Sequence, residues 1–150
     1  NSAAVKNKSI IKDVAQMFGS QALIISINAK KISYNKWEVF IDKGREETGL
    51  DVLKWAKFAE KSGAGEIHIN SIDNDGTFNG FDYDLVKKLS KIIKLPLVIG
   101  GGLGNIEHID KLLRIENIEG VSASSALHYK KLTIYHIKKQ IKKNNLNVRI

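Results

Sequence analysis

The sequence contains no cysteine, a single proline and no long apolar run, and each absence narrows the class of protein. Without cysteine the chain can form neither a disulfide framework nor a thiolate metal site. No apolar stretch approaches the roughly 18 residues that span a bilayer, and the chain opens without the segments of a secretory signal. We therefore expect a cytoplasmic protein that does not insert into membranes.

Acidic residues are scarce relative to basic ones, with 16 Asp and Glu against 24 Lys and Arg, which gives a formal net charge of +8. This excess would suit an anionic small molecule, a nucleic acid or an acidic partner. Lysine pairs such as Lys87-Lys88 and Lys138-Lys139 fit the solvated faces of helices. Because no aromatic residues interleave with the basic runs as a stacking platform, we expect no nucleic-acid binding.

Histidines are few and show no spacing typical of metal ligands. They are His68, His108, His128 and His136. None of them forms an H-x-x-x-H motif or pairs with a carboxylate, so we expect no metal and no cofactor. We interpret His68 as a hydrogen-bonded residue of the sheet interior.

Segments with helical and strand-like patterns alternate along the chain. Residues 8–18 place apolar side chains on one helical face. Residues 22–27 form a continuous apolar run, typical of a strand buried on both faces of a parallel sheet. Residues 30–43 alternate and predict a small hairpin arm. The next helix is expected to start near Thr48, whose hydroxyl can cap it, and to end at Gly63.

The alternation continues to the end of the chain. The further expected elements are strands at 66–72, 97–99 and 120–123, and helices at 82–93, 106–113 and 133–143. Strands that alternate with helices imply right-handed crossovers and a parallel sheet. We predict an α/β fold of the (β/α)8 TIM-barrel type, in which residues 1–150 supply about four βα units, half of a barrel.

A half barrel would be incomplete by itself. It would leave two strand edges and an inner apolar face uncovered, which is an association hazard. We expect it to pair either with another half that is absent from this chain or with a second copy as a homodimer. The chain opens at Asn1 without an initiator methionine, as a fragment or processed product would.

Glycine-rich or polar segments follow three successive predicted strands. They are Asp73-Asn74-Asp75-Gly76-Thr77, Gly100-Gly101-Gly102-Leu103-Gly104-Asn105 and Ser122-Ala123-Ser124-Ser125. In β/α barrels the chemistry lies at the C-terminal ends of the strands. Glycine lets backbone N–H groups approach an anion, and serine hydroxyls and the start of a short helix supply further donors. Each loop alone could be ordinary turn chemistry, but together they predict a phosphate site.

These residues, in this order, resemble the C-terminal half of the cyclase subunit of imidazole glycerol phosphate synthase, a histidine-biosynthesis enzyme. The resemblance covers essentially the whole chain, and the N-terminal half of the barrel is absent. The matching stretches are Asn1–Val5, Phe18–Gln21, Gly63–Ile67, Ser71–Thr77, Gly101–His108 and Asn147–Arg149.

The resemblance implies a cyclase that acts in a heterodimer with a glutaminase subunit. Ammonia made by the glutaminase would travel through the barrel to the strand ends and meet a bisphosphorylated ribulosyl aminoimidazole carboxamide nucleotide. The family closes an imidazole ring and releases imidazole glycerol phosphate and aminoimidazole carboxamide ribotide. It uses two aspartates, one from each half-barrel, as general acid and base.

The resemblance also implies roles for individual positions. Asn1 and Ser2 fall on the family's first phosphate site, and Glu66 falls on a charged ring that gates ammonia. The positions on the second phosphate site are Asp75, Gly76, Gly101, Gly102, Ser124 and Ser125. Because the carboxylate of Asp75 would repel a phosphate, we expect this residue to act through its backbone or to orient the substrate. Asp73 is expected to cap the turn.

Three positions at the reacting centre depart from the family pattern. Asn28 stands in place of the catalytic aspartate, Asn70 in place of a threonine and Gly100 in place of a serine. An amide has no titratable proton and cannot shuttle one. Three interpretations stay open: a genuine cyclase, a non-cyclising paralogue that channels ammonia to a sugar amidotransferase of surface-polysaccharide biosynthesis, and an inactive phosphate-binding half barrel.

Overall fold

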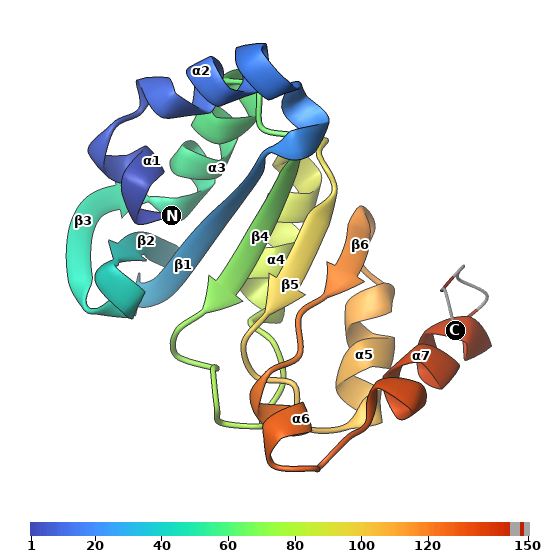
Figure 1. Cartoon of the computed structure of the whole chain (residues 1–150). Coiled ribbons are helices and arrows are strands. Elements are labelled where there is room, and N and C mark those ends of the chain that lie inside the picture. The colour runs from blue at the N-terminus through green and yellow to red at the C-terminus, as the bar shows by residue number, and fades with distance from the viewer. Residues whose placement is uncertain (145–147, 149–150) are drawn as a thin grey trace.

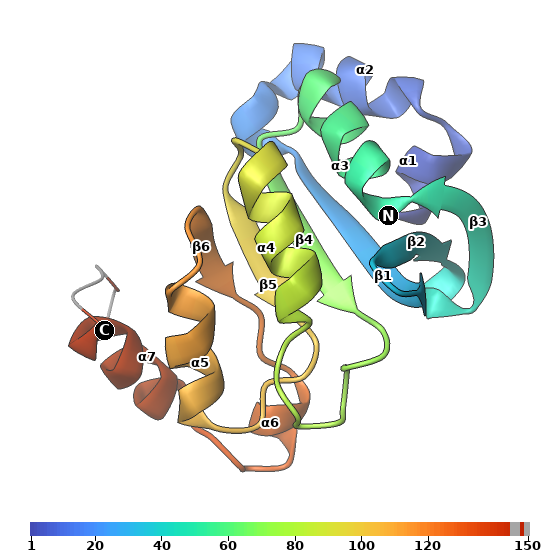
Figure 2. The same ribbon diagram turned by 180° about the vertical axis from the view of Figure 1, so that it is seen from behind.

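The computed structural model describes residues 1–144 and 148 and contains a single six-stranded sheet, with the helices that connect its parallel strands packed on one face (Figures 1 and 2). The strands are β1 Ile24–Ser33, β2 Lys36–Ile41, β3 Glu46–Asp51, β4 Glu66–Ser71, β5 Leu97–Gly100 and β6 Ile118–Val121. The helices are α1 Ser2–Lys6, α2 Ser9–Phe18, α3 Val52–Lys61, α4 Tyr83–Ile92, α5 Ile106–Leu113, α6 Ser125–His128 and α7 Ile134–Lys143. Asn147 and Arg149, which belong to one of the matching stretches, lie outside the described residues.

The strand order is β3-β2-β1-β4-β5-β6, and β1, β4, β5 and β6 are parallel. Helix α3 connects β1 and its hairpin to β4, α4 connects β4 to β5, and α5 connects β5 to β6. This is the expected series of βα units, and it is consistent with part of a (β/α)8 barrel. The predicted hairpin is also present, because β2 pairs antiparallel with the C-terminal part of β1.

The predicted start of the third helix near Thr48 is wrong. Residues Glu46–Asp51 form β3, which pairs antiparallel with β2. The hydroxyl of Thr48 donates to the carbonyl oxygen of Val39 at 2.6 Å and is therefore used inside the hairpin. The helix is capped by Asp51, whose carboxylate accepts from the backbone N–H of Lys54 at 2.9 Å.

The two faces of the parallel strands differ in polarity. Ile67 and Ile69 of β4 are buried against the helices, with 0% and 1% of their surface exposed. The alternate residues Glu66, His68 and Asn70 point to the opposite face, which in a closed barrel is the interior, and are only half-buried. The expectation of an apolar inner face is therefore wrong for β4: this part of the face is polar.

The edges of the sheet are partly covered. Strand β4 pairs with residues 24–29 of β1, whereas β2 pairs only with residues 28–33 on the other side. Among the described residues, no strand pairs with the outer side of residues 24–27 or with the outer side of β6. These are the two places where further strands could continue the sheet.

Asp82 joins the hairpin to α4, and we expect its replacement to destabilise the fold. Its carboxylate accepts from the indole N–H of the buried Trp37 at 2.6 Å. It also accepts from the backbone N–H of Leu85 at 3.1 Å and thereby caps α4. Asp82→Ala should lower the free energy of unfolding by about 2–4 kcal/mol, because a cap is lost and a buried donor is left unpaired. Asp51→Ala removes a cap alone and should cost about 1 kcal/mol. Chemical denaturation that gives equal losses would contradict this account.

Candidate functional site

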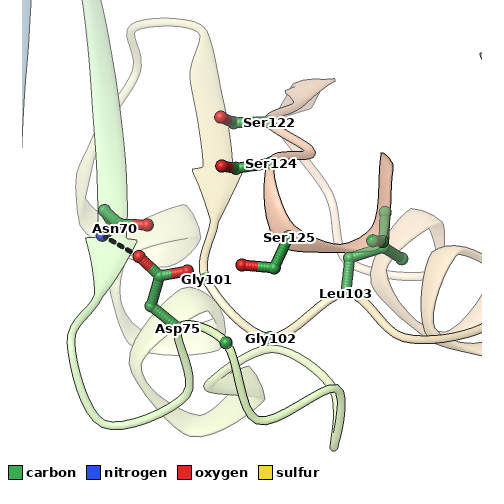
Figure 3. A pocket seen from close by; sticks show the side chains of 10 residues that line it. Asn70, Asp75, Gly101, Gly102, Leu103, Ser122, Ser124 and Ser125 are labelled. Carbon is green, nitrogen blue, oxygen red and sulfur yellow. Dashed lines mark hydrogen bonds between the residues drawn. The ribbon is translucent and has the colours of Figure 1, made fainter. Parts of the chain in front are cut away.

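A small cleft lies where β4, β5 and β6 end, at the carboxyl edge of the parallel sheet (Figure 3). Its walls come from three segments distant in sequence: the loop after β4, the loop after β5, and the segment that leads from β6 into α6. The residues that line it are Asn70, Asp75, Gly76, Gly101, Gly102, Leu103, Ser122, Ser124, Ser125 and Ala126. The structure thus brings together the three loops that the sequence singled out.

The loop after β5 is held tightly against the loop after β4. The backbone N–H of Gly80, in the loop after β4, donates to the carbonyl oxygen of Gly102, in the loop after β5, at 2.8 Å. Within the loop after β4, Asn74 Nδ2 fixes Gly80 by donating to its carbonyl oxygen at 2.7 Å. Gly102 has a φ of +105°, and a Cβ atom there would collide with the carbonyl oxygen of Gly80. A side chain at position 102 would therefore separate the two loops.

Donors for an anion are available on the side of the cleft formed by the serines. Figure 3 shows the hydroxyls of Ser122, Ser124 and Ser125 on one side of the cleft and Asn70 and Asp75 on the other. Among the described residues, no hydrogen bond uses the backbone N–H of Gly102, Ser124 or Ser125. Unused N–H groups of residues that line a cleft, together with serine hydroxyls, are the donors from which anion-binding concavities are built.

Asp75 is the only charged side chain among the described residues that line the cleft. Its backbone N–H donates to the carbonyl oxygen of Ser71 at 3.0 Å, so this group is not free for a ligand. The expectation that Asp75 acts through its backbone is wrong in this respect. One oxygen of its carboxylate accepts from Asn70 Nδ2 at 3.4 Å and the other points into the cleft toward Ser125 (Figure 3), which leaves the orienting role as a proposal.

Two side chains that support the cleft were missed by the sequence analysis. Asn74 braces the loop after β4, because its Oδ1 accepts from the hydroxyl of the buried Ser71 at 2.9 Å while its Nδ2 donates to the carbonyl oxygen of Gly80. His108, on α5, accepts from the backbone N–H of Gly104 through Nδ1 at 3.1 Å. The spacing of His108 from the cap residue Asn105, which accepts from the backbone N–H of His108, was the available signal.

The contact of His108 predicts an acid-sensitive fold. Burial, opposed by Glu107, lowers the pKa of His108 below its usual 6.5, and protonation of Nδ1 would remove the acceptor for Gly104. Since the unfolded chain binds this proton at higher pH than the folded one, the stability contribution is full above about pH 6.5 and declines below it. Denaturation between pH 8 and 5 should show this decline. His108→Gln should reduce it, whereas the exposed His136→Gln should leave it unchanged; equal pH profiles would refute the assignment.

The positions that depart from the family pattern lie in one row across the sheet. Asn28 of β1 pairs in register with Asn70 of β4, which pairs in turn with Gly100 of β5. All three belong to the inner face, next to the cleft that Asn70 lines. The structure therefore groups these residues at one level of the sheet, directly below the strand-end loops.

The remaining predicted site residues lie elsewhere. Asn1 Nδ2 donates to the carbonyl oxygen of Phe40 at 2.8 Å, and the hydroxyl of Ser2 accepts from the backbone N–H of Asp42 at 3.2 Å. Both residues lie beside the hairpin, near the opposite edge of the sheet from β6 and α6 (Figure 1). Glu66 is the first residue of β4, at the opposite end of the strand from the cleft. The residues of the two predicted phosphate sites are thus separated across the strands of the sheet, one group near the hairpin and the other at β4, β5 and β6.

Asp73 has a tethering contact rather than a place in the cleft. Its carboxylate accepts from the backbone N–H of Lys31 at 2.7 Å, which ties the loop after β4 to β1. Within residues 1–144 and 148, no group of histidine and carboxylate side chains has an arrangement suited to a metal ion. The same residues contain no helix with the length and apolar character needed to cross a membrane.

Comparison with known proteins agrees with the resemblance seen in the sequence. The profile of a family described as histidine biosynthesis protein matches residues 1–133. The imidazole glycerol phosphate synthase subunit HisF of Bacillus cereus (strain Q1) is 39% identical over 150 residues, which are 100% of this chain and 60% of that protein. The chain thus spans 60% of the length of this relative. Because the family profile matches residues 1–133, which are most of the chain, the chain belongs to the histidine biosynthesis protein family.

Proposed function

We propose that the complete protein is a cyclase of the imidazole glycerol phosphate synthase type, in which this chain forms the C-terminal half of the barrel. Ammonia from a glutaminase partner would react with a bisphosphorylated ribulosyl aminoimidazole carboxamide nucleotide. The products would be imidazole glycerol phosphate and aminoimidazole carboxamide ribotide. Since the chain spans only part of its relative, these activities concern the whole protein and its partner.

The cleft at the ends of β4, β5 and β6 is the observation that carries this proposal. Gly102 lines the cleft, and no described residue accepts from its backbone N–H. Ser124 and Ser125 add hydroxyl groups opposite Asp75 (Figure 3). We propose that these groups bind one phosphate of the substrate and that Asn1 and Ser2, beside the hairpin, bind the other. The separation of the two groups across the sheet suits a substrate with a phosphate at each end.

Substrate atoms between the two phosphates would lie over the row formed by Asn28, Asn70 and Gly100. We propose that this row faces the reacting centre. Ammonia would reach it from the opposite end of the strands, past Glu66, which we propose as part of a gate. In this arrangement the polar inner face of β4 lies along the path of the ammonia.

One observation favours a second candidate function. Asn28 cannot exchange a proton, and the family has an aspartate at this position, so the protein could deliver ammonia without closing the ring. Its partner would then be a sugar amidotransferase of surface-polysaccharide biosynthesis. The phosphate cleft would retain a binding role. An inactive phosphate-binding half barrel is a third, separate alternative.

Turnover with free ammonium salt distinguishes these functions. The complete protein is incubated with the bisphosphorylated nucleotide, and both products are followed by chromatography. The proposed function predicts that the two products appear in equal amounts and that their formation stops without ammonia. Binding of the nucleotide without either product would reject the cyclase and favour the ammonia-channelling alternative.

A further inference from the structure

His68 lies on the inner face of β4, between Glu66 and Asn70, at a level that the predicted mechanism does not use. In register it pairs with Ser26 of β1 and with Val98 of β5. Strand geometry places it about 7 Å below the row of Asn28, Asn70 and Gly100. It therefore lies on the side of the reacting centre from which ammonia would arrive.

The two ring nitrogens of His68 have different surroundings. Nδ1 is 3.3 Å from the hydroxyl oxygen of Ser26, close enough for a hydrogen bond. Nε2 is buried, and no described residue forms a hydrogen bond with it. If Nδ1 carries the proton and donates it to Ser26, Nε2 has a free lone pair. A buried polar atom without a partner is uncommon in folded proteins and calls for a ligand or a function.

Nε2 of His68 lies close to Gly100 of the neighbouring strand β5. A Cβ atom at Gly100 would lie 3.2 Å from His68 Nε2 and 3.1 Å from Asn70 Oδ1. The imidazole therefore points up the strand toward the row of Asn28, Asn70 and Gly100, and a side chain at position 100 would crowd Nε2. On β1, β4 and β5 up to this row, the inner-facing residues that can titrate are Glu66 and His68.

We propose that His68 is the proton-transferring residue of this half barrel and accepts, through Nε2, a proton from the ammonia that attacks the substrate. This inference rests on the proposed function and adds to it a group that can titrate where Asn28 cannot. A general base must lie within hydrogen-bond reach of the proton that it accepts, and ammonia bound between His68 and the row above it would meet this requirement.

The step neither adds nor removes a proton overall, because the proton that His68 accepts is later returned to the substrate. The ammonia nitrogen forms a bond to the carbonyl carbon of the ribulosyl group, and the π electrons of the carbonyl move to its oxygen. One proton passes from the new ammonium group to Nε2. The imidazolium then returns this proton to the oxygen, which gives a carbinolamine and neutral His68. No oxidant or further reactant is needed.

The surroundings of His68 keep it neutral near pH 7. Burial lowers the pKa of His68 below its usual 6.5, and the charge of Glu66 opposes this shift only in part. The groups that face it from the neighbouring strands, Ser26, Val98 and Gly100, carry no charge. Because a base of this kind is inactive when protonated, the rate should fall at low pH, with an apparent pKa below 6.5. We call this fall the acid limb of the pH profile.

The test compares the parent with His68→Gln in the complete protein, at saturating ammonium salt and between pH 5 and 9. His68→Gln should lower the rate of product formation at least about 100-fold and abolish the acid limb. It should leave the affinity for inorganic phosphate unchanged. The exposed His136→Gln is the matched control and should behave as the parent. Ser26→Ala keeps the imidazole and should move the acid limb to lower pH, because the imidazolium loses an acceptor.

The outcomes separate this inference from the proposed function. An active parent with a His68→Gln variant of similar rate and the same acid limb would overturn the role of His68 and leave the cyclase intact. Loss of phosphate affinity together with turnover, or an unmoved limb in Ser26→Ala, would mean a structural role and would also overturn it. A parent that binds the nucleotide but forms neither product would overturn the proposed function itself, on which the role rests.

Discussion

Replacement of Gly102 by alanine is expected to reduce the affinity of the complete protein for the bisphosphorylated nucleotide by about 100-fold or more, which is roughly 3 kcal/mol. The new Cβ atom would collide with the carbonyl oxygen of Gly80 and would lie 3.0 Å from Cβ of Asn74. The loops after β4 and β5 would have to separate, which moves the backbone N–H groups away from the anion. Isothermal titration calorimetry measures the loss.

Gly49 provides the matched control. It also has a positive φ, +71°, but a Cβ atom at this position would meet no described atom within 4 Å, and Gly49 has no place in the cleft. Gly49→Ala should cost about 1 kcal/mol of stability through backbone strain and should leave the affinity unchanged. If Gly102→Ala binds the nucleotide as the parent does, the close approach of the two loops does not form the phosphate site.

Replacement of Asn28 by aspartate is expected to raise the rate of ring closure by about 100-fold, the lower end of what a positioned acid or base contributes. Position 28 is half-buried and lies in register with Asn70, one strand away from it. A carboxylate there would add a titratable group at the level of the reacting centre, above His68. The rate is measured with the complete protein at saturating nucleotide and ammonium salt.

The control for this gain is Asn70→Asp, which introduces the same charge at the same level on β4. Asn70 donates to Asp75 at 3.4 Å, so a carboxylate at position 70 would instead repel Asp75 and should not raise the rate. Equal gains in both variants would point to a general effect of charge. No gain in Asn28→Asp, with the nucleotide still bound, would remove position 28 from the chemistry.

Local signals in the sequence predicted most of the βα units. The helix expected at 106–113 is α5, and its cap Asn105 accepts from the backbone N–H of His108 at 3.1 Å. The end of the hairpin could not be predicted in the same way. Residues Glu46–Asp51 are mostly polar and include Gly49, so they lack a strand pattern, and they form β3 because β2 offers an edge for pairing. Two possible caps, Thr48 and Asp51, stand three residues apart, and tertiary contacts decide between them.

The candidate site was predictable as a set of loops but not as a geometry. The glycines and serines after the strands indicated a phosphate cleft, and the structure brings the three loops together. Strand register and loop contacts determine two details of the site. The backbone N–H of Asp75 donates to Ser71, and Nε2 of His68 has no hydrogen-bond partner beside Gly100. A single sequence does not determine which side chains face each other across strands.

The most direct test of this account is an NMR titration of the complete protein with inorganic phosphate, followed through the backbone amide signals. We predict saturable shifts that are largest at Gly102, Ser124 and Ser125 and that disappear in Gly102→Ala. If the largest shifts fall instead on the lysines of α7, phosphate binds there through surface charge. That result would contradict an anion site at the ends of β4, β5 and β6.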